Sequence, residues 1–186
     1  MRKTMNILIA YTTGAGSTER AARLLQEHLP GAVRANLAEG FPEPSGYDAV
    51  ILGSGIWFGK IGKPLRQYLT QYWEVLKEMD KAVFICHALP EETREILRAN
   101  FSLQMRNSCI LVESLGGELD PSRLSAVDRL RLKARKPQLL QMVREGLVPA
   151  IDVAKALEFA KTFRDTVDPP EVVFDQKTRR LVEVRQ

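Results

Sequence analysis

The sequence has too few cysteines and histidines for a disulfide framework or a zinc site. Its 186 residues include two cysteines, Cys86 and Cys109, and two histidines, His28 and His87, and these four residues show no metal-ligand spacing. Both cysteines lie in apolar runs, so we expect them to be buried and reduced. The sequence therefore predicts neither a bound metal nor a disulfide bridge.

The sequence also lacks a long apolar run and a large charge of one sign. No apolar run approaches the length of a membrane span, and the apolar run near the basic start is too short for a signal peptide. We therefore expect a cytoplasmic protein. The net charge is +4, from 27 basic and 23 acidic residues. This charge is too small to indicate a nucleic-acid partner, but it suits acidic partners, anionic ligands or a membrane surface.

The most informative stretch that is present is residues 5–19, MNILIAYTTGAGSTE. Its apolar half is continuous rather than alternating, which predicts a strand buried on both faces. Glycines and hydroxyl residues follow, and a helix opens at Glu19. Backbone N–H groups at a helix N-terminus bind phosphate, and nearby hydroxyls donate to it. The stretch therefore predicts an anion site; the alternative is an ordinary strand-to-helix turn with one hydroxyl as the helix cap.

Two familiar phosphate loops do not fit this stretch. It lacks the lysine of the nucleotide triphosphate loop GxxxxGK[ST]. Of the dinucleotide pattern GxGxxG only Gly14 and Gly16 are present, because Glu19 stands at the third glycine position, and Asn36 or Glu39 is a poor substitute for the ribose-binding acid. What remains is a loop suited to a terminal phosphate monoester held by neutral donors.

Strands and helices alternate along the chain, which predicts a parallel sheet covered by helices on both faces. The prolines and glycines of residues 38–47 predict a loop in place of one crossover helix. The expected strands are residues 5–11, 32–37, 48–53, 82–88 and 109–115. The expected helices begin at Glu19, Lys63, Pro90 and Pro121 and after Asp152, with Asp120 and Asp152 as N-caps.

Three loops leave the carboxyl ends of the central strands, where doubly wound sheets bind their ligands. They are residues 12–18, 54–60 and 87–90. The middle loop carries Trp57 and Phe58 among small residues, which favours stacking on a flat aromatic ligand. The alternative is that both rings cover the following helix as part of the core.

A phosphate at one loop and a planar ring at the next describe flavin mononucleotide (FMN), and at these residues the chain resembles the flavodoxin family. The loop TTGAGST is one residue longer than the usual (S/T)xTGxT turn. Together with ILGSGIWFGK and GGELDPSRLSAVDRLRLK, it is most similar to the branch that contains menaquinone-dependent protoporphyrinogen oxidase. The resemblance covers residues 5–115 and resumes at the helix after Asp152.

The resemblance implies an α/β, flavodoxin-like, doubly wound five-stranded parallel sheet in the order 2-1-3-4-5, with FMN as cofactor. The first loop would hold the phosphate, the second would line one side of the ring, and the third would lie on the other side. The implied cofactor-binding residues are Thr12, Thr13, Gly14, Ala15, Gly16, Ser17, Thr18, Ser54, Gly55, Ile56, Trp57, Phe58, Gly59, His87, Ala88 and Leu89.

The function implied by the resemblance is an oxidoreductase that moves electrons between a reduced substrate and a quinone-like or protein acceptor, with protoporphyrinogen as the named substrate. The alternatives are a non-enzymatic electron-transfer protein that acts with a protein partner, and the same fold with an empty or different anion site. No catalytic residue is assigned. His87 has an ordinary pKa near neutrality, so it is a candidate to donate to the flavin or relay a proton, and a plain loop histidine is the alternative.

Two further segments suggest partners. Basic residues between 129 and 136 alternate with Leu130 and Leu132, which suits an anionic lipid surface or an anionic small-molecule substrate, or else a solvated helix face. After Pro169-Pro170, residues 171–174 and 181–184 are β-prone and predict a hairpin. We therefore divide the chain into an FMN-binding domain, 1–167, and a tail, 168–186. Since an isolated hairpin is marginal in water, we expect the tail to pack on its own domain, to pair with a sheet edge or to join a homodimer.

Overall fold

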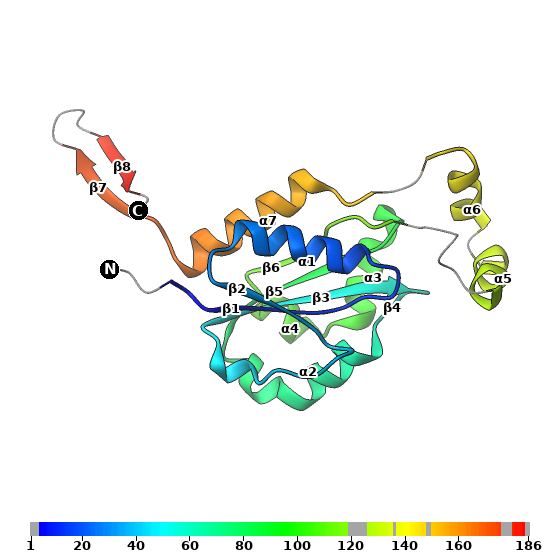
Figure 1. The fold of residues 1–186 in the computed structure, drawn as a ribbon, viewed down its shortest axis with the longest axis horizontal. Coiled ribbons are helices and arrows are strands. Elements are labelled where there is room, and N and C mark those ends of the chain that lie inside the picture. The colour runs from blue at the N-terminus through cyan, green and yellow to red at the C-terminus, as the bar shows by residue number, and fades with distance from the viewer. Residues whose placement is uncertain (1–3, 119–125, 136, 148–149, 176–179, 185–186) are drawn as a thin grey trace.

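A parallel sheet in the order β2-β1-β3-β5-β6 organises the chain (Figure 1). The computed structural model describes residues 4–118, 126–135, 137–147, 150–175 and 180–184. The order is the one predicted, with one additional strand, β4, beside β3. The six strands of this sheet are β1 Ile7–Thr12, β2 Ala32–Asn36, β3 Ala49–Trp57, β4 Lys60–Ile61, β5 Asp80–Cys86 and β6 Leu111–Ser114.

Helices cover both faces of the sheet, as expected for buried parallel strands. Helices α1 (Ser17–His28) and α7 (Val153–Val167) lie on one face, and α2 (Lys63–Leu76) lies on the other (Figure 1). Alternate residues of β1 serve the two cores: Ile7 and Ile9 pack in the cluster with α1 and α7, whereas Leu8 and Ala10 pack in the cluster with α2. Both faces of β1 are therefore fixed by packing, which places its carboxyl end firmly.

The third strand differs from its prediction. Residues 54–60 were expected to be a loop, but β3 continues to Trp57, turns at Phe58 and Gly59, and returns as β4. Trp57 pairs with Lys60 and Ile56 with Ile61. Phe58 and Gly59 have φ angles of 48° and 77°, which is the geometry of a type I′ two-residue turn. We call residues 56–61 the β3–β4 hairpin.

The segment after β5 is also more broken than predicted. The single helix expected to begin at Pro90 is instead a short 3-10 turn, η2 (Pro90–Glu92), followed by α3 (Thr93–Asn100) and α4 (Leu103–Ser108). The break occurs because Ser102 caps α4: its Oγ accepts a hydrogen bond from the Met105 N–H at 3.1 Å. The loop expected over 38–47 is confirmed, with one 3-10 turn, η1 (Pro44–Gly46).

Two short helices, α5 (Ala126–Arg135) and α6 (Pro137–Arg144), follow β6. Asp120 and Pro121, the expected cap and first residue of this helix, lie outside the described residues. Leu132 and Leu139 are buried against Leu89, so this helix pair is joined to the loop after β5. No helix in the described ranges is long and apolar enough to span a membrane.

The closing helix and the tail agree with the sequence. Asp152 caps α7, because its Oδ1 accepts a hydrogen bond from the Lys155 N–H at 2.9 Å. Strands β7 (Glu171–Asp175) and β8 (Arg180–Val184) form the expected antiparallel hairpin. Among the described strands, β7 and β8 pair only with each other.

Candidate functional site

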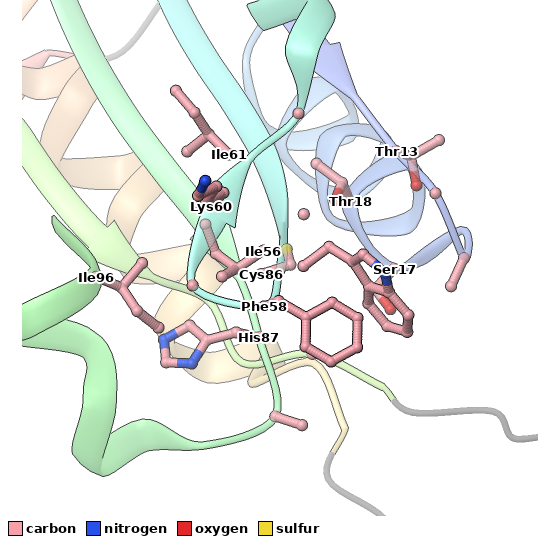
Figure 2. A pocket seen from close by; sticks show the side chains of 18 of the residues that line it. Thr13, Ser17, Thr18, Ile56, Phe58, Lys60, Ile61, Cys86, His87 and Ile96 are labelled. Atoms are coloured by element: carbon pink, nitrogen blue, oxygen red, sulfur yellow. The ribbon is translucent and has the colours of Figure 1, made fainter. Parts of the chain in front are cut away.

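A cavity of about 550 Å³ lies beyond the carboxyl ends of β1, β3 and β5. It is lined by all three predicted loops, by the β3–β4 hairpin, by the start of α2 and by residues of η2, α3, α5 and α6. Figure 2 shows Thr13, Ser17 and Thr18 on one side of it, with His87 and Ile96 on the other. The volume lies within the range of small-molecule sites, roughly 300–1,000 Å³.

The predicted binding residues come together at this cavity with two exceptions, Gly16 and Ser54. Gly16 instead starts α1 in the left-handed conformation, with φ 95°. The buried Ser54 ties β3 to the start of α2: its Oγ donates to the Gly55 carbonyl at 2.8 Å and accepts from the Gly62 N–H at 2.9 Å. The predicted residues that do line the cavity are Thr12, Thr13, Gly14, Ala15, Ser17, Thr18, Gly55, Ile56, Trp57, Phe58, Gly59, His87, Ala88 and Leu89.

Several residues that line the cavity were not predicted from the sequence. Cys86 and Glu92 flank the third loop, so wider margins around that loop would have found them. Leu132, Leu139 and Glu118 are far from the three loops in sequence, and no local pattern links them. The missed lining residues are Lys60, Ile61, Gly62, Lys63, Cys86, Glu92, Ile96, Gly117, Glu118, Leu132 and Leu139.

The start of α1 has the features of an anion site. Thr13 Oγ1 accepts a hydrogen bond from the Gly16 N–H at 3.0 Å, which shapes the loop. The first turn of a helix leaves its N–H groups without partners inside the helix, and the helix dipole is positive there. Gly14 is exposed, and a Cβ built on it would meet no atom within 4 Å. The loop therefore leaves room for an anion beside the first turn of α1.

The hydroxyl residues of this loop also hold the surrounding elements. Ser17 Oγ donates to the Glu118 carbonyl at 3.3 Å and accepts from the Glu118 N–H at 3.2 Å. Thr18 is buried, and its hydroxyl hydrogen-bonds the Cys86 thiol. Because the Ser17 and Thr18 hydroxyls are engaged by the protein, Thr13 is better placed than either of them to donate to a ligand.

The β3–β4 hairpin brings two aromatic rings to the cavity. The Trp57 and Phe58 ring centroids are 5.0 Å apart with an interplanar angle of 67°. Trp57 is 39% exposed, and neither ring belongs to a buried core cluster. This placement favours ligand stacking over a role in the core. The left-handed conformation of Phe58 costs about 1–2 kcal/mol for a residue with a Cβ, so the surrounding structure must hold it.

The thiol and imidazole at the end of β5 are both uncharged near neutral pH. Burial raises the pKa of the Cys86 thiol to about 12. Burial lowers the pKa of His87, which is 8% exposed. Its Nε2 lies 2.9 Å from Thr93 Oγ1, whereas its Nδ1 is closed to solvent and has no hydrogen-bond partner among the described residues. A role for His87 in binding or proton transfer stays a prediction. Cys109, expected to be buried, is half-buried.

Charges of both signs surround the cavity. No acidic residue lies in the loop 87–90, but Glu92 follows it closely and lines the cavity, as does Glu118. The Glu118 carboxylate pairs with Arg20 Nη1, at 2.6 Å from Oε1. Lys60 and Lys63 also line the cavity, and both are exposed. The site is therefore not an acidic surface.

The comparisons with known proteins agree with this fold. Residues 8–136 match the family model described as "Flavodoxin domain". The chain is similar to the flavodiiron core Flv1 from Synechocystis sp. PCC6803, with 12% identity, a TM-score of 0.55, and coverage of 88% of this chain and 36% of that one. It is also similar to a variant of the flavo di-iron protein from Thermotoga maritima, with 14% identity, a TM-score of 0.51, and coverage of 89% and 37%.

These two structures are much longer than the matched chain, which spans only 36% and 37% of their lengths, so they bear on the fold alone. Oxidised flavodoxin 1 from Bacillus cereus has 15% identity and a TM-score of 0.49, with coverage of 84% of this chain and 95% of that one. No curated protein sequence matches the chain. The family model covers well over half of the sequence. The chain therefore belongs to the flavodoxin domain family and has its FMN-binding fold.

Proposed function

We propose that the chain binds FMN in this cavity and uses it to transfer electrons between a reduced substrate and an acceptor. The observation that supports this is the cavity wall, which combines the start of α1 with the rings of Trp57 and Phe58. FMN has a terminal phosphate and a planar ring, so it needs both kinds of wall in one cavity.

The start of α1 would hold the phosphate through uncharged donors. Thr13 Oγ1 accepts the Gly16 N–H at 3.0 Å, which leaves its hydroxyl proton available for a phosphate oxygen. The N–H groups in the first turn of α1 add further donors, and the helix dipole favours the negative charge.

The β3–β4 hairpin and the loop 87–89 would lie on the two sides of the ring. When bound, FMN supplies one-electron and two-electron transfer. The protein would orient the ring and keep water away from it. Ile56, Leu89 and Ile96 provide apolar walls for this purpose. The Cys86 thiol remains protonated, since its pKa is about 12, so it is part of the wall and not a nucleophile.

The helix pair α5–α6 supports a small-molecule reaction. Leu132 and Leu139 extend the apolar wall begun by Leu89, and such a wall suits a quinone or another flat apolar molecule. Lys60 and Lys63 supply positive charge at the rim for an anionic substrate. Protoporphyrinogen, the substrate of the branch that the sequence resembles, is the named candidate.

Electron transfer to a protein partner is the second candidate function. Trp57 is 39% exposed, and Lys60 and Lys63 are exposed beside the same cavity, which suits an acidic protein surface. Turnover of a quinone or of protoporphyrinogen by the purified protein would support the enzyme. Fast electron exchange with a reductase, without such turnover, would support the protein partner.

Contact with a membrane surface and formation of a homodimer also stay predictions. On α5, Val127 and Leu130 are 57% and 69% exposed, and the exposed Lys133 lies on the same helix, which suits an anionic lipid surface. For the homodimer, the β7–β8 hairpin offers strand edges that are unpaired among the described strands, and such edges can pair with another chain.

Titration of the apoprotein with FMN and with riboflavin tests the proposed site. We expect FMN to bind more tightly than riboflavin, because only FMN has the phosphate. Thr13→Val should weaken FMN by about tenfold or more, since a hydrogen bond to a charged group contributes about 1.5–3 kcal/mol, and should leave riboflavin unchanged. Thr166→Val, at an exposed threonine of α7, is the control. Equal affinity for the two flavins would place the phosphate elsewhere.

A further inference from the structure

The β3–β4 hairpin is too small to hold its own position. It has two cross-strand pairs, Trp57 with Lys60 and Ile56 with Ile61, and a two-stranded ribbon is marginal in water without further packing. Its tip contains Phe58 in the left-handed conformation, with φ 48°. The rings that wall the cavity therefore depend on something outside the hairpin.

Part of this support is the packing of Ile61 and Ile56 in the core cluster with α2, and the polar part comes from Asn100, the last residue of α3. Its Nδ2 donates to the Gly59 carbonyl at 2.8 Å, and its Oδ1 accepts from the Ile61 N–H at 3.0 Å. Its Nδ2 also donates to the Ile96 carbonyl at 2.8 Å, which fixes the amide to its own helix. Since both backbone groups flank Lys60, the amide of Asn100 pairs with the outer edge of β4 as a neighbouring strand would.

The chemistry of these contacts requires an amide. One end must donate to a carbonyl and the other must accept from an N–H, and only asparagine and glutamine have both in one planar group. An aspartate at position 100 would accept from Ile61 but would set a carboxylate oxygen against the Gly59 carbonyl. An alanine would leave both backbone groups without this partner.

We propose that Asn100 is a positioning residue for the aromatic side of the cofactor site. It does not line the cavity, and it acts through the hairpin by setting where Trp57 and Phe58 stand. This inference rests on the proposed function for its effect on flavin. Its effect on the hairpin itself does not.

The test compares Asn100→Asp and Asn100→Ala with the wild type and with Asn107→Asp. Asn107 is exposed on α4, so Asn107→Asp introduces the same negative charge at a site away from the hairpin. The first readout is hydrogen exchange of the Ile61 amide in the apoprotein. We expect exchange to be faster by about tenfold or more in Asn100→Ala, because this amide loses its partner. Exchange should also be faster in Asn100→Asp, because the carboxylate is repelled by the Gly59 carbonyl and the contact with Ile61 is weakened. It should be unchanged in Asn107→Asp.

The second readout is flavin affinity. We expect both Asn100 variants to bind FMN and riboflavin more weakly by similar factors, because the ring and not the phosphate loses its support, whereas Thr13→Val should affect FMN alone. The flavin spectrum and reduction potential should shift in the Asn100 variants only. Asn100→Ala adds no charge and serves if Asn100→Asp does not fold.

Two results would overturn the inference: Ile61 exchange unchanged in a folded Asn100 variant, or faster exchange with unchanged affinity, spectrum and potential. If the wild type binds neither flavin, the proposed function fails, and the exchange readout still decides whether Asn100 holds the hairpin.

Discussion

Replacement of Phe58 by asparagine should lower FMN affinity while leaving the stability of the apoprotein nearly unchanged. Asparagine adopts the left-handed conformation far more readily than phenylalanine, and Asn-Gly is a preferred sequence for a type I′ turn. Because asparagine tolerates the conformation at φ 48°, the substitution should stabilise the folded apoprotein by about 1–2 kcal/mol. Loss of the edge contact with Trp57, at 5.0 Å between centroids, should cost about 0.5–1.5 kcal/mol.

These two terms nearly cancel, so the apoprotein should keep its melting temperature within about 2–4 °C, the change that 1 kcal/mol makes in a protein of this size. FMN affinity should nevertheless fall by about tenfold, or about 1.4 kcal/mol, because half of a phenyl side chain's burial against the ring is lost. Thermal unfolding of the apoprotein and fluorescence titration with FMN measure the two effects separately.

Phe58→Tyr is the matched control, since it keeps both the ring and the left-handed backbone. It should match the wild type in both assays. An unchanged FMN affinity in Phe58→Asn would refute a ring contact at this residue. A fall of more than about 6 °C in the apoprotein would show instead that Phe58 is a core residue.

Three further predictions concern other parts of the chain. Burial raises the pKa of the Cys86 thiol to about 12 and that of Cys109 to about 11, so Ellman's reagent at pH 8 should label both slowly until the protein is unfolded; rapid labelling of native Cys86 would contradict this. Burial lowers the pKa of His87, with Glu91 and Glu92 raising it and Lys155 lowering it. The folded state then binds fewer protons than the unfolded state, so stability should rise with pH up to about 6.5 and this dependence should be smaller in His87→Gln; an equal dependence would assign it to other groups. Removal of residues 169–186 should change the melting temperature or the mass in solution, and no change in either would make the hairpin an independent appendage.

The sequence predicted the main sheet because its strands are buried on both faces. Continuous apolar runs such as 7–10 and 49–52 have one stable place in an α/β protein, and the carboxyl ends of parallel strands meet at one edge. That is why three loops far apart in sequence were correctly expected to lie near one another. The Asp152 cap and the tail hairpin followed from equally local signals.

The parts that the sequence did not predict depend on exceptions or on distant contacts. A turn at Phe58-Gly59 has no usual sequence signal, because phenylalanine rarely takes a positive φ. Ser102 interrupts a helical pattern with a cap that only the structure reveals. Leu132, Leu139 and Asn100 act across long stretches of chain, and no periodicity in one sequence links them to the site.

The central claim is that the phosphate of FMN lies at the start of α1. Amide chemical shifts of ¹⁵N-labelled apoprotein, followed during titration with FMN, test it residue by residue. We expect the phosphate group to cause its largest amide shifts in residues 13–19, and inorganic phosphate alone should reproduce these shifts. Shifts that instead centre on the basic surface of α2 at Lys63 and Arg66, with residues 13–19 unmoved, would contradict it.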